Sequence, residues 1–147
     1  MPYNKLEKIN MKTCFAMVVL CAGLLLTGCK EQKSFDSMCQ KEARDQTLKM
    51  CPRKVAQGIT IDSMTYHTDG KVFTYWHTMD DSLYQVDRIS KAEGQLRKAI
   101  CREITNSLEL KQYKEHQVSF SYVYRGQSSG KIIMQFLFTP KDYQVAQ

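Results

Sequence analysis

The chain has 147 residues, of which 21 are basic and 15 are acidic, so its formal net charge is +6. A chain of this length can bury one hydrophobic core but is too short for two domains of ordinary size. The basic residues are spread along the sequence instead of clustering. This distribution is not typical of a nucleic-acid-binding protein and suits a surface that lies near anionic lipid headgroups.

The N-terminal segment has the pattern of an export signal. Three lysines precede an apolar run over residues 15–26. Because a transmembrane helix needs about 20 apolar residues, this shorter run favours a signal peptide. A start at Met11 would give the signal a more compact form, so residues 1–10 are a candidate misassigned start.

The apolar run closes with Leu26, Thr27, Gly28 and Cys29, which together resemble the lipobox of bacterial lipoprotein signal peptides. The resemblance implies that signal peptidase recognises the first three residues and cleaves before Cys29. The cysteine is then acylated on its sulfur and on its new amino group. Several acyl chains give stable attachment, since each buried CH₂ contributes about 0.8 kcal/mol. We therefore expect loss of residues 1–28 and a lipid anchor at Cys29.

The predicted anchor also indicates a location in the cell envelope. Lys30 follows the cysteine, and by resemblance to enterobacterial lipoproteins the absence of Asp at this position favours the outer membrane over the inner one. The folded part would face the periplasm or the cell surface. Residues 29–34 are expected to form the lipidated cysteine and a polar tether, and residues 35–147 a single domain.

The first predicted element of this domain is a helix. Ser37 begins a segment of capping-box form, and no Gly or Pro interrupts the sequence before Pro52. The helix has a thin apolar stripe, which consists of Phe35, Met38, Cys39 and Ala43.

A β-hairpin is predicted next. Two alternating runs flank Asp69-Gly70, a strong hairpin signal because a type I′ turn requires positive φ at both central positions. The resulting register pairs Tyr66 with Phe73 and places both on the core side. A break in the alternation near Asp62 predicts a β-bulge.

The middle of the chain predicts a loop followed by the main helix. Residues 79–89 are polar and poorly patterned, and a second capping box begins at Ser90. The helix is expected to extend to about Ser107. Its apolar positions recur at helical spacing and are Ala92, Leu96, Ile100 and Ile104.

The last third predicts a second hairpin. Residues 118–125 and 131–139 alternate, with Tyr122 expected opposite Met134, and Pro140 ends the second strand. Both strands present aromatic rows to the same side. The order helix, hairpin, helix, hairpin predicts an α+β fold, with a four-stranded antiparallel sheet and a helix packed on one face.

Three cysteines remain after the signal peptide and the lipidated residue, and one disulfide is expected in an oxidising compartment. Cys39 and Cys51 would lie about 18 Å apart along one helix. A disulfide needs Cα atoms within about 7 Å, so Cys101 becomes the shared partner. We expect Cys51–Cys101, and Cys39–Cys101 is the alternative.

The lipobox, tether, hairpins and cysteine-bearing helix together resemble the small α+β pilotin lipoproteins of type II secretion systems. The matching segments are residues 96–101, 118–122 and 130–133. The resemblance implies a non-enzymatic protein that escorts outer-membrane secretin subunits by binding a helical peptide from their C-terminus.

The sequence shows little sign of site chemistry. An enzyme would require a cleft that gathers Asp62, His77 and Cys101, and no spacing implies one. The chain has no C-x-x-C or H-x-x-x-H spacing and no glycine-rich phosphate loop. We therefore expect no catalytic residues, no metal and no cofactor.

Partner binding is expected on the outward face of the sheet, which carries semi-apolar side chains. Its candidate residues are Val72, Trp76, Val123, Ile133 and Leu137. The alternative is that the first helix covers this face. The sequence thus predicts a non-enzymatic, lipid-anchored envelope protein with a binding or assembly role. A structural or stress lipoprotein without a defined ligand, and a small envelope enzyme, are the alternatives.

Overall fold

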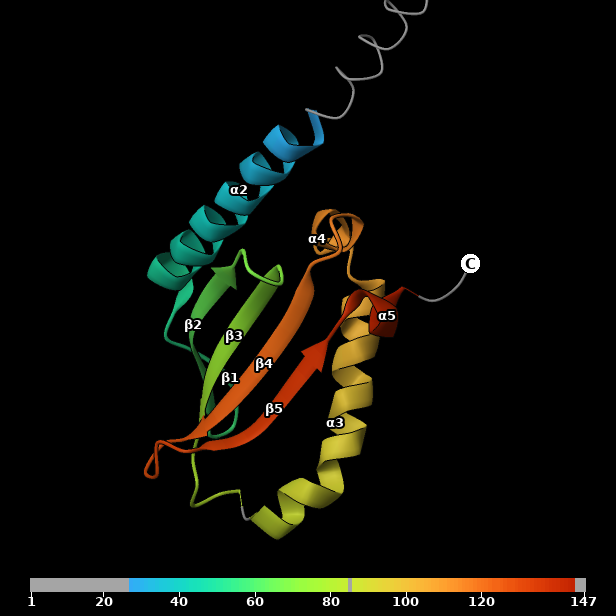
Figure 1. Cartoon of the computed structure of the whole chain (residues 1–147). Helices are drawn as coiled ribbons and strands as arrows, with labels where there is room; N and C mark the ends of the chain where they lie inside the picture. Colours follow the sequence, from blue (N-terminus) through green and yellow to red (C-terminus); the bar gives the residue numbers. More distant parts are fainter. Residues whose placement is uncertain (1–26, 85, 145–147) are drawn as a thin grey trace, which may run out of the picture. The chain divides into compact units, whose positions relative to one another are not determined.

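The structure is a computed structural model that describes residues 27–84 and 86–144 (Figure 1). The chain divides into two compact units, Met1–Phe35 and Asp36–Gln147. The predicted signal sequence up to Leu26 lies outside the described residues. Within the described ranges, no helix combines the length and the apolar character needed to cross a bilayer.

Helix α2 (Thr27–Met50) begins earlier than the capping box at Ser37 predicts. Residues 30–34, predicted as a tether, are helical. Their Lys, Glu and Gln residues have high helix propensity, and without a Gly or Pro nothing in this segment stops the helix. Within the second unit, the buried residues of α2 are Cys39 and Ala43, which lie on one side of the helix at i and i+4.

The sheet has five strands in the order β1-β2-β3-β4-β5. The α+β class is confirmed, whereas the prediction of four antiparallel strands is wrong. The neighbours β3 and β4 are parallel, and the other pairs are antiparallel. The strands are β1 (Arg53–Ala56), β2 (Ile59–His67), β3 (Val72–Met79), β4 (Ser119–Gly126) and β5 (Ile132–Phe138).

The parallel pair results from the long connection between β3 and β4. Helix α3 (Val86–Asn106) has 21 residues and spans about 31 Å, enough to carry the chain back along the full length of β3. The short helix α4 (Lys111–Glu115) then leads into β4 from the end at which β3 begins. A strand, helix and strand connected in this way give a parallel pair.

Strand β1 was not predicted, because all four of its residues are exposed and no alternation marks it. It pairs with β2 at the edge of the sheet. The connection passes through Gly58, whose φ of +66° favours glycine.

The register of the first hairpin is confirmed, whereas its predicted type I′ turn is wrong, because Gly70 and Lys71 have positive φ and Asp69 does not. Tyr66 pairs with Phe73, and the register shifts between Ile61 and Ser63, where the bulge was expected. This shift places His77 opposite Ile61.

The register of the second hairpin differs from the prediction. Tyr122 pairs with Phe136 and not with Met134, and the register shifts between Tyr124 and Arg125. Because the difference on β5 is two residues, most of its side chains still point to the predicted faces.

The predicted loop over residues 79–89 is shorter than expected. Met79 is the last residue of β3, and α3 begins at Val86, ahead of the capping box at Ser90. After β5, Pro140 ends the strand as expected and also begins α5 (Pro140–Tyr143). The side chain of Asp142 caps this helix by accepting the N–H of Thr139 at 2.8 Å.

The core lies on one face of the sheet, here called the covered face, against which the four described helices, α2 to α5, pack. Its fully enclosed side chains include Phe73, Phe120 and Phe138. Helix α2 is attached by the hydrogen bond from Tyr66 Oη to Asp36 Oδ1 at 2.7 Å. Helix α3 is attached by Arg97, whose guanidinium lies 4.8 Å from the centroid of the Phe138 ring. Helices α4 and α5 are attached by ring contacts, with centroid distances of 5.6 Å between Tyr113 and Phe73 and 5.7 Å between Tyr143 and Phe120.

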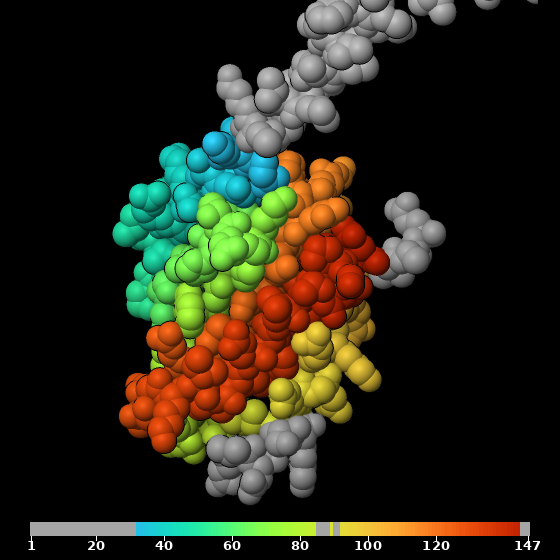
Figure 2. Space-filling view, viewed as in Figure 1, coloured from blue at the N-terminus to red at the C-terminus, as the bar shows by residue number. Residues whose placement is uncertain are grey.

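The opposite face, here called the open face, carries Thr74, Trp76, Ser121 and Val123. Figure 2 shows atoms of β2 to β5, green to red, at the surface of the molecule. Helix α2 contacts Met64 and Tyr66, which are residues of the covered face. The alternative that the first helix covers the open face is therefore wrong.

Candidate functional site

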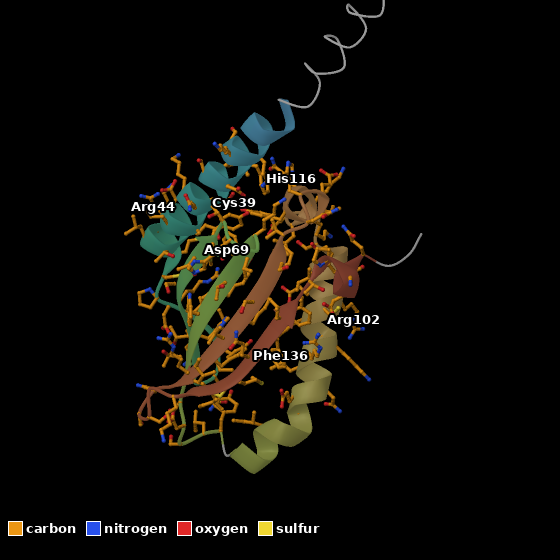
Figure 3. All side chains as sticks on the ribbon, in the orientation of Figure 1. Cys39, Arg44, Asp69, Arg102, His116 and Phe136 are labelled. Carbon is orange, nitrogen blue, oxygen red and sulfur yellow. The ribbon has the colours of Figure 1, made fainter. Side chains whose placement is uncertain are left out.

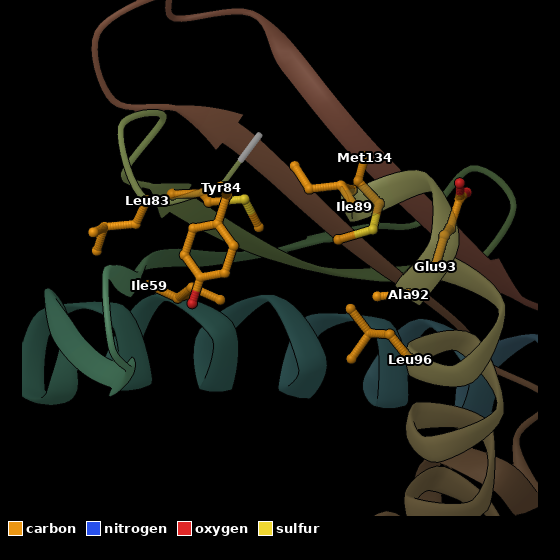
Figure 4. Close-up of a pocket in the computed structure, with 9 residues that line it drawn as sticks. Ile59, Leu83, Tyr84, Ile89, Ala92, Glu93, Leu96 and Met134 are labelled. Carbon is orange, nitrogen blue, oxygen red and sulfur yellow. The ribbon is translucent and has the colours of Figure 1, made fainter. Parts of the chain in front are cut away.

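The covered face contains a cavity of about 340 Å³ beside the N-terminal half of α3 (Figure 4). It lies between this helix, the strands and the loop that follows β3. Most of its lining is aliphatic or aromatic, as is usual for binding pockets. The lining residues are Ile59, Met79, Leu83, Tyr84, Ile89, Ala92, Glu93, Leu96 and Met134.

Local sequence explains why the cavity forms. Ala92 supplies only a methyl group where α3 faces the strands, so space is left beside it. The loop that forms another wall is attached to the β1–β2 turn. Tyr84 Oη donates to the Gln57 carbonyl at 2.6 Å, and the Asp80 N–H donates to the Gly58 carbonyl at 2.8 Å.

An aromatic row continues the covered face beyond the cavity. Tyr75 and Tyr122 lie on the neighbouring strands β3 and β4, with stacked rings 4.9 Å apart. The imidazole of His77 stacks on Tyr124 at 4.5 Å. Together these four side chains form what we call the tyrosine row.

The centre of the tyrosine row is less covered than the rest of the core. Helix α2 attaches over β2, where Thr47 Oγ1 accepts the Met64 N–H at 2.7 Å and donates to the Met64 carbonyl at 3.0 Å. Helix α3 attaches over β5 through Arg97. Tyr75 and Tyr122, on the strands in between, are only half-buried.

Burial shifts the pKa values of the tyrosine row toward the neutral forms. It raises the pKa of Tyr75 and Tyr122 above the ordinary range and that of Tyr124 to about 12, and the carboxylate of Glu103 adds to each shift. Burial lowers the pKa of His77, although its hydrogen bond to the Val123 carbonyl opposes the shift. The row therefore offers neutral ring faces and hydroxyl groups at physiological pH.

The predicted partner-binding residues do share the open face. Trp76 pairs with Val123 across the parallel strands, and Leu137 is 46% exposed. Val72 and Ile133 are half-buried. Val123 is only 2% exposed, so it supports this face more than it contributes surface. Partner binding by these residues remains a prediction.

The polar and aromatic groups of Trp76 are already engaged within the open face. Its indole N–H donates to Thr65 Oγ1 at 3.0 Å, and the Arg125 guanidinium lies 4.4 Å from the ring centroid. These contacts give Trp76 a structural role that the sequence pattern did not indicate.

The residues considered for catalysis do not form one cleft. Asp62 is exposed and accepts a hydrogen bond from Thr78 Oγ1 at 2.6 Å, while His77 is buried on the covered face. The Cys101 thiol on α3 donates to the Asp142 carbonyl at 3.3 Å. Among the described residues, no three His, Cys, Asp or Glu side chains lie close enough together to hold a metal ion.

The predicted disulfide between Cys51 and Cys101 is absent, and Cys39, Cys51 and Cys101 are free thiols. Cys51 precedes the edge strand β1, whereas Cys101 contacts α5, which follows the opposite edge strand β5. Four strand spacings of about 4.8 Å separate these edges, far more than the 7 Å or so that a disulfide allows. Cys39 on α2 (Figure 3) is fully enclosed, and burial raises its pKa to about 12.

A sequence-family comparison matches most of the folded region. The family model described as "Domain of unknown function (DUF8479)" matches residues 34–134. None of the curated proteins matches the chain in sequence.

Several solved structures share the fold. A Pseudomonas aeruginosa protein inferred to be secreted has a TM-score of 0.65 at 12% identity, covering 77% of this chain and 96% of its own. The pilotin EpsS of the Vibrio vulnificus type 2 secretion system has a TM-score of 0.58 at 7% identity, covering 80% and 98%. The type II secretion pilotin AspS of Vibrio cholerae has a TM-score of 0.54 at 13% identity, covering 78% and 96%. At such identities the likeness is one of fold.

Proposed function

The chain belongs to the family described as "Domain of unknown function (DUF8479)", and from this premise we propose that it is a lipid-anchored envelope protein that binds a segment of a partner protein. The observation that carries the proposal is the apolar cavity of about 340 Å³ beside α3. The cavity opens to solvent, since Leu83 is 50% exposed and Ala92 and Glu93 are exposed, and an accessible apolar cavity is the usual form of a site that receives an apolar side chain.

The strands that line the cavity indicate which secondary structure a bound segment would have. The strands contribute Ile59 of β2, Met79 of β3 and Met134 of β5 to the cavity, and β2 and β3 are interior strands that offer side chains and no free backbone groups. A segment that lies over these interior strands must satisfy its own backbone hydrogen bonds, as a helix does. We propose an amphipathic helix that places an apolar side chain in the cavity.

A pilotin-like role in the assembly of a secretion system is the form of this function that we favour. It is supported by the likeness of fold to two type II secretion pilotins and by the lipobox-like sequence. The proposed partner is the C-terminal helical segment of an outer-membrane secretin subunit. The role is one of binding, without catalysis.

Lipid attachment at Cys29 is part of the proposal. Helix α2 begins at Thr27, so acylation would occur within its first turn. Radiolabelled palmitate should enter the wild-type protein, and Cys29→Ala should abolish labelling and move the protein from the membrane to the soluble fraction. Unchanged fractionation of Cys29→Ala would contradict lipid anchoring.

The binding site is tested by filling the cavity. We expect Ala92→Phe in the detergent-solubilised full chain to weaken binding of a fluorescent secretin C-terminal peptide by at least about tenfold, which corresponds to about 1.4 kcal/mol. Gln95→Phe is the control, because it places the same ring at an exposed position of α3 that does not line the cavity.

The open face provides the contrary outcome. If Ala92→Phe binds the peptide as the wild type does while Trp76→Ala weakens binding, the docking surface is the open face and the cavity proposal fails.

A further inference from the structure

The exposed charges of α2 are of one sign. Within the second unit, the charged side chains of this helix that are exposed are Lys41, Arg44 and Lys49. Helix α3, in contrast, exposes both signs, with Glu103 next to Arg102. A surface that carries charge of one sign attracts an oppositely charged partner, whereas a mixed surface is normally only solvated.

The acidic residues of α2 in this unit do not cancel the positive charge. Asp36, Glu42 and Asp45 are each partly buried. Asp36 accepts the hydrogen bond of Tyr66 Oη at 2.7 Å. Asp45 lies 3.7 Å from Lys41, but an exposed pair of this kind contributes little, so Lys41 stays available to another anion.

An apolar side chain projects among these charges. Leu48 is 77% exposed. Lys41, Arg44 and Leu48 are spaced at i, i+3 and i+7, so they share the outer side of α2, away from the buried Cys39 (Figure 3). A single exposed leucine is ordinary, but a leucine flanked by basic residues on one helix side is typical of a helix that lies on an anionic lipid surface.

The edge of the sheet extends this surface. Helix α2 ends at Met50, and β1 begins at Arg53. Arg53 is exposed and pairs with Ile61, whose buried side chain belongs to the covered face, so both lie on the side of the sheet where α2 packs. What we call the basic surface therefore consists of Lys41, Arg44, Leu48, Lys49 and Arg53.

We propose that the basic surface binds an anionic phospholipid bilayer, with Leu48 inserted among the headgroups. Each basic side chain near such a bilayer adds to the attraction, and an apolar residue on the same helix side enters the boundary between headgroups and acyl chains. A bilayer is favoured over an acidic protein segment because Leu48 projects from the helix, as a side chain that inserts into lipid must.

This inference goes beyond the proposed function, because it concerns the outer side of α2 and not the cavity beside α3. It also assigns an orientation to the protein. Helix α2 packs on the covered face, so its outer side and the open face of the sheet point in opposite directions. With α2 on the bilayer, the open face is directed away from the membrane.

Quenching of a single tryptophan tests the contact. The sequence contains one tryptophan, so Trp76→Phe gives a background in which Leu48→Trp is the reporter. The full chain is transferred from detergent into vesicles of phosphatidylcholine brominated in its acyl chains, alone or mixed equally with phosphatidylglycerol, and bound protein is isolated by flotation. We expect Leu48→Trp to lose about half of its emission in the phosphatidylglycerol vesicles and to stay unquenched in the others.

Matched variants assign the effect to the basic surface. Leu137→Trp in the same background places the reporter on the open face and should not be quenched in either vesicle. Arg44→Gln should reduce the ratio of inserted to free Leu48→Trp by up to about fivefold, and high salt should act in the same direction. Arg102→Gln removes the same charge from an exposed position of α3 and should leave the ratio unchanged.

The outcomes are separate from those of the cavity proposal. Absence of quenching of Leu48→Trp in the phosphatidylglycerol vesicles, or equal quenching of Leu137→Trp, overturns the lipid contact. A blue shift of Leu48→Trp with polyglutamate, without quenching by anionic vesicles, assigns the surface to an acidic protein segment and overturns it as well. Failure of the wild type to bind the secretin peptide would contradict the proposed function and leave the lipid contact standing.

Discussion

The two faces of the sheet differ in how closely their side chains are packed. On the open face, no described helix covers the strands, yet Thr74, Ser121 and Val123 are buried and the Trp76 N–H is bonded to Thr65. On the covered face, the four described helices pack against the strands, yet a cavity remains beside α3 and Tyr75 and Tyr122 are only half-buried. The difference teaches that coverage alone does not identify a binding surface in this protein. Accessible apolar space is the better indicator.

The largest expected effect comes from truncating an aromatic side chain in the core of the covered face. Phe120 is 0% exposed, and Phe120→Ala should lower the free energy of unfolding by about 3–5 kcal/mol, because it removes buried area and leaves a void. Urea unfolding measures the change. Leu137→Ala, on the 46% exposed side chain of the open face, should lower it far less. Similar losses for both variants would contradict the distinction between the faces.

A second test removes the side chain that caps the C-terminal end of α3, the helix that packs over β5. Lys114 Nζ donates to the carbonyls of Ile104, Thr105 and Ser107 at 3.0, 2.7 and 2.9 Å, where α3 ends. Lys114→Met should lower the free energy of unfolding by about 2 kcal/mol, since it removes charged hydrogen bonds to free helix-end carbonyls.

Hydrogen exchange should report this change as faster exchange in the last turn of α3. Lys111→Met is the control, because its pairing with Glu115 at 3.8 Å is exposed and contributes at most about 1 kcal/mol. An equal effect of both variants would show that Lys114 does not cap the helix.

A third test concerns the self-contained polar network of the open face. Trp76→Phe should lower the free energy of unfolding by about 1 kcal/mol, because it removes the hydrogen bond to Thr65 and weakens the contact with Arg125. A double-mutant cycle with Thr65→Val measures the coupling. If Trp76 serves structure only, peptide binding by Trp76→Phe should equal that of the wild type.

The smallest expected effect is a pH dependence that arises from the covered face. Burial lowers the pKa of His77, so the folded protein keeps this ring neutral where the unfolded chain, with an ordinary pKa of about 6.5, takes up a proton. Because the unfolded state then binds more protons, stability should be full above about pH 6.5 and fall as the pH drops below it.

Urea midpoints at pH 7.5 and 5.5 measure this effect, and His77→Gln should show a smaller difference than the wild type. Asp142, whose hydrogen bonds to Thr139 lower its pKa, should lose its contribution only near and below pH 4. Protonation of Asp142 therefore does not contribute to the difference in stability between pH 7.5 and pH 5.5. A wild-type stability that is flat over this interval would show that His77 is not held neutral by the fold.

Patterns that are local in the chain were predicted well from the sequence. Asp69-Gly70 and the broken alternation near Asp62 placed the first hairpin and its bulge, because turn chemistry and period-two alternation act over a few residues. The faces of most predicted strand residues followed for the same reason, but Ile132, predicted on the core side, is 55% exposed next to the register shift. Helix starts were less accurate, since α2 and α3 both extend beyond their capping boxes.

The tertiary structure alone decided which segments became neighbours. Alternation reports which side chains are buried but not which strand lies alongside or in which direction it runs, so the parallel β3–β4 pair and the exposed β1 were missed. The separation of Cys51 from Cys101 and the cavity beside Ala92 depend on the same long-range arrangement. The sequence by itself determined the predicted lipobox signal, the α+β class and the strand faces, whereas the candidate site exists only where α3 crosses the sheet.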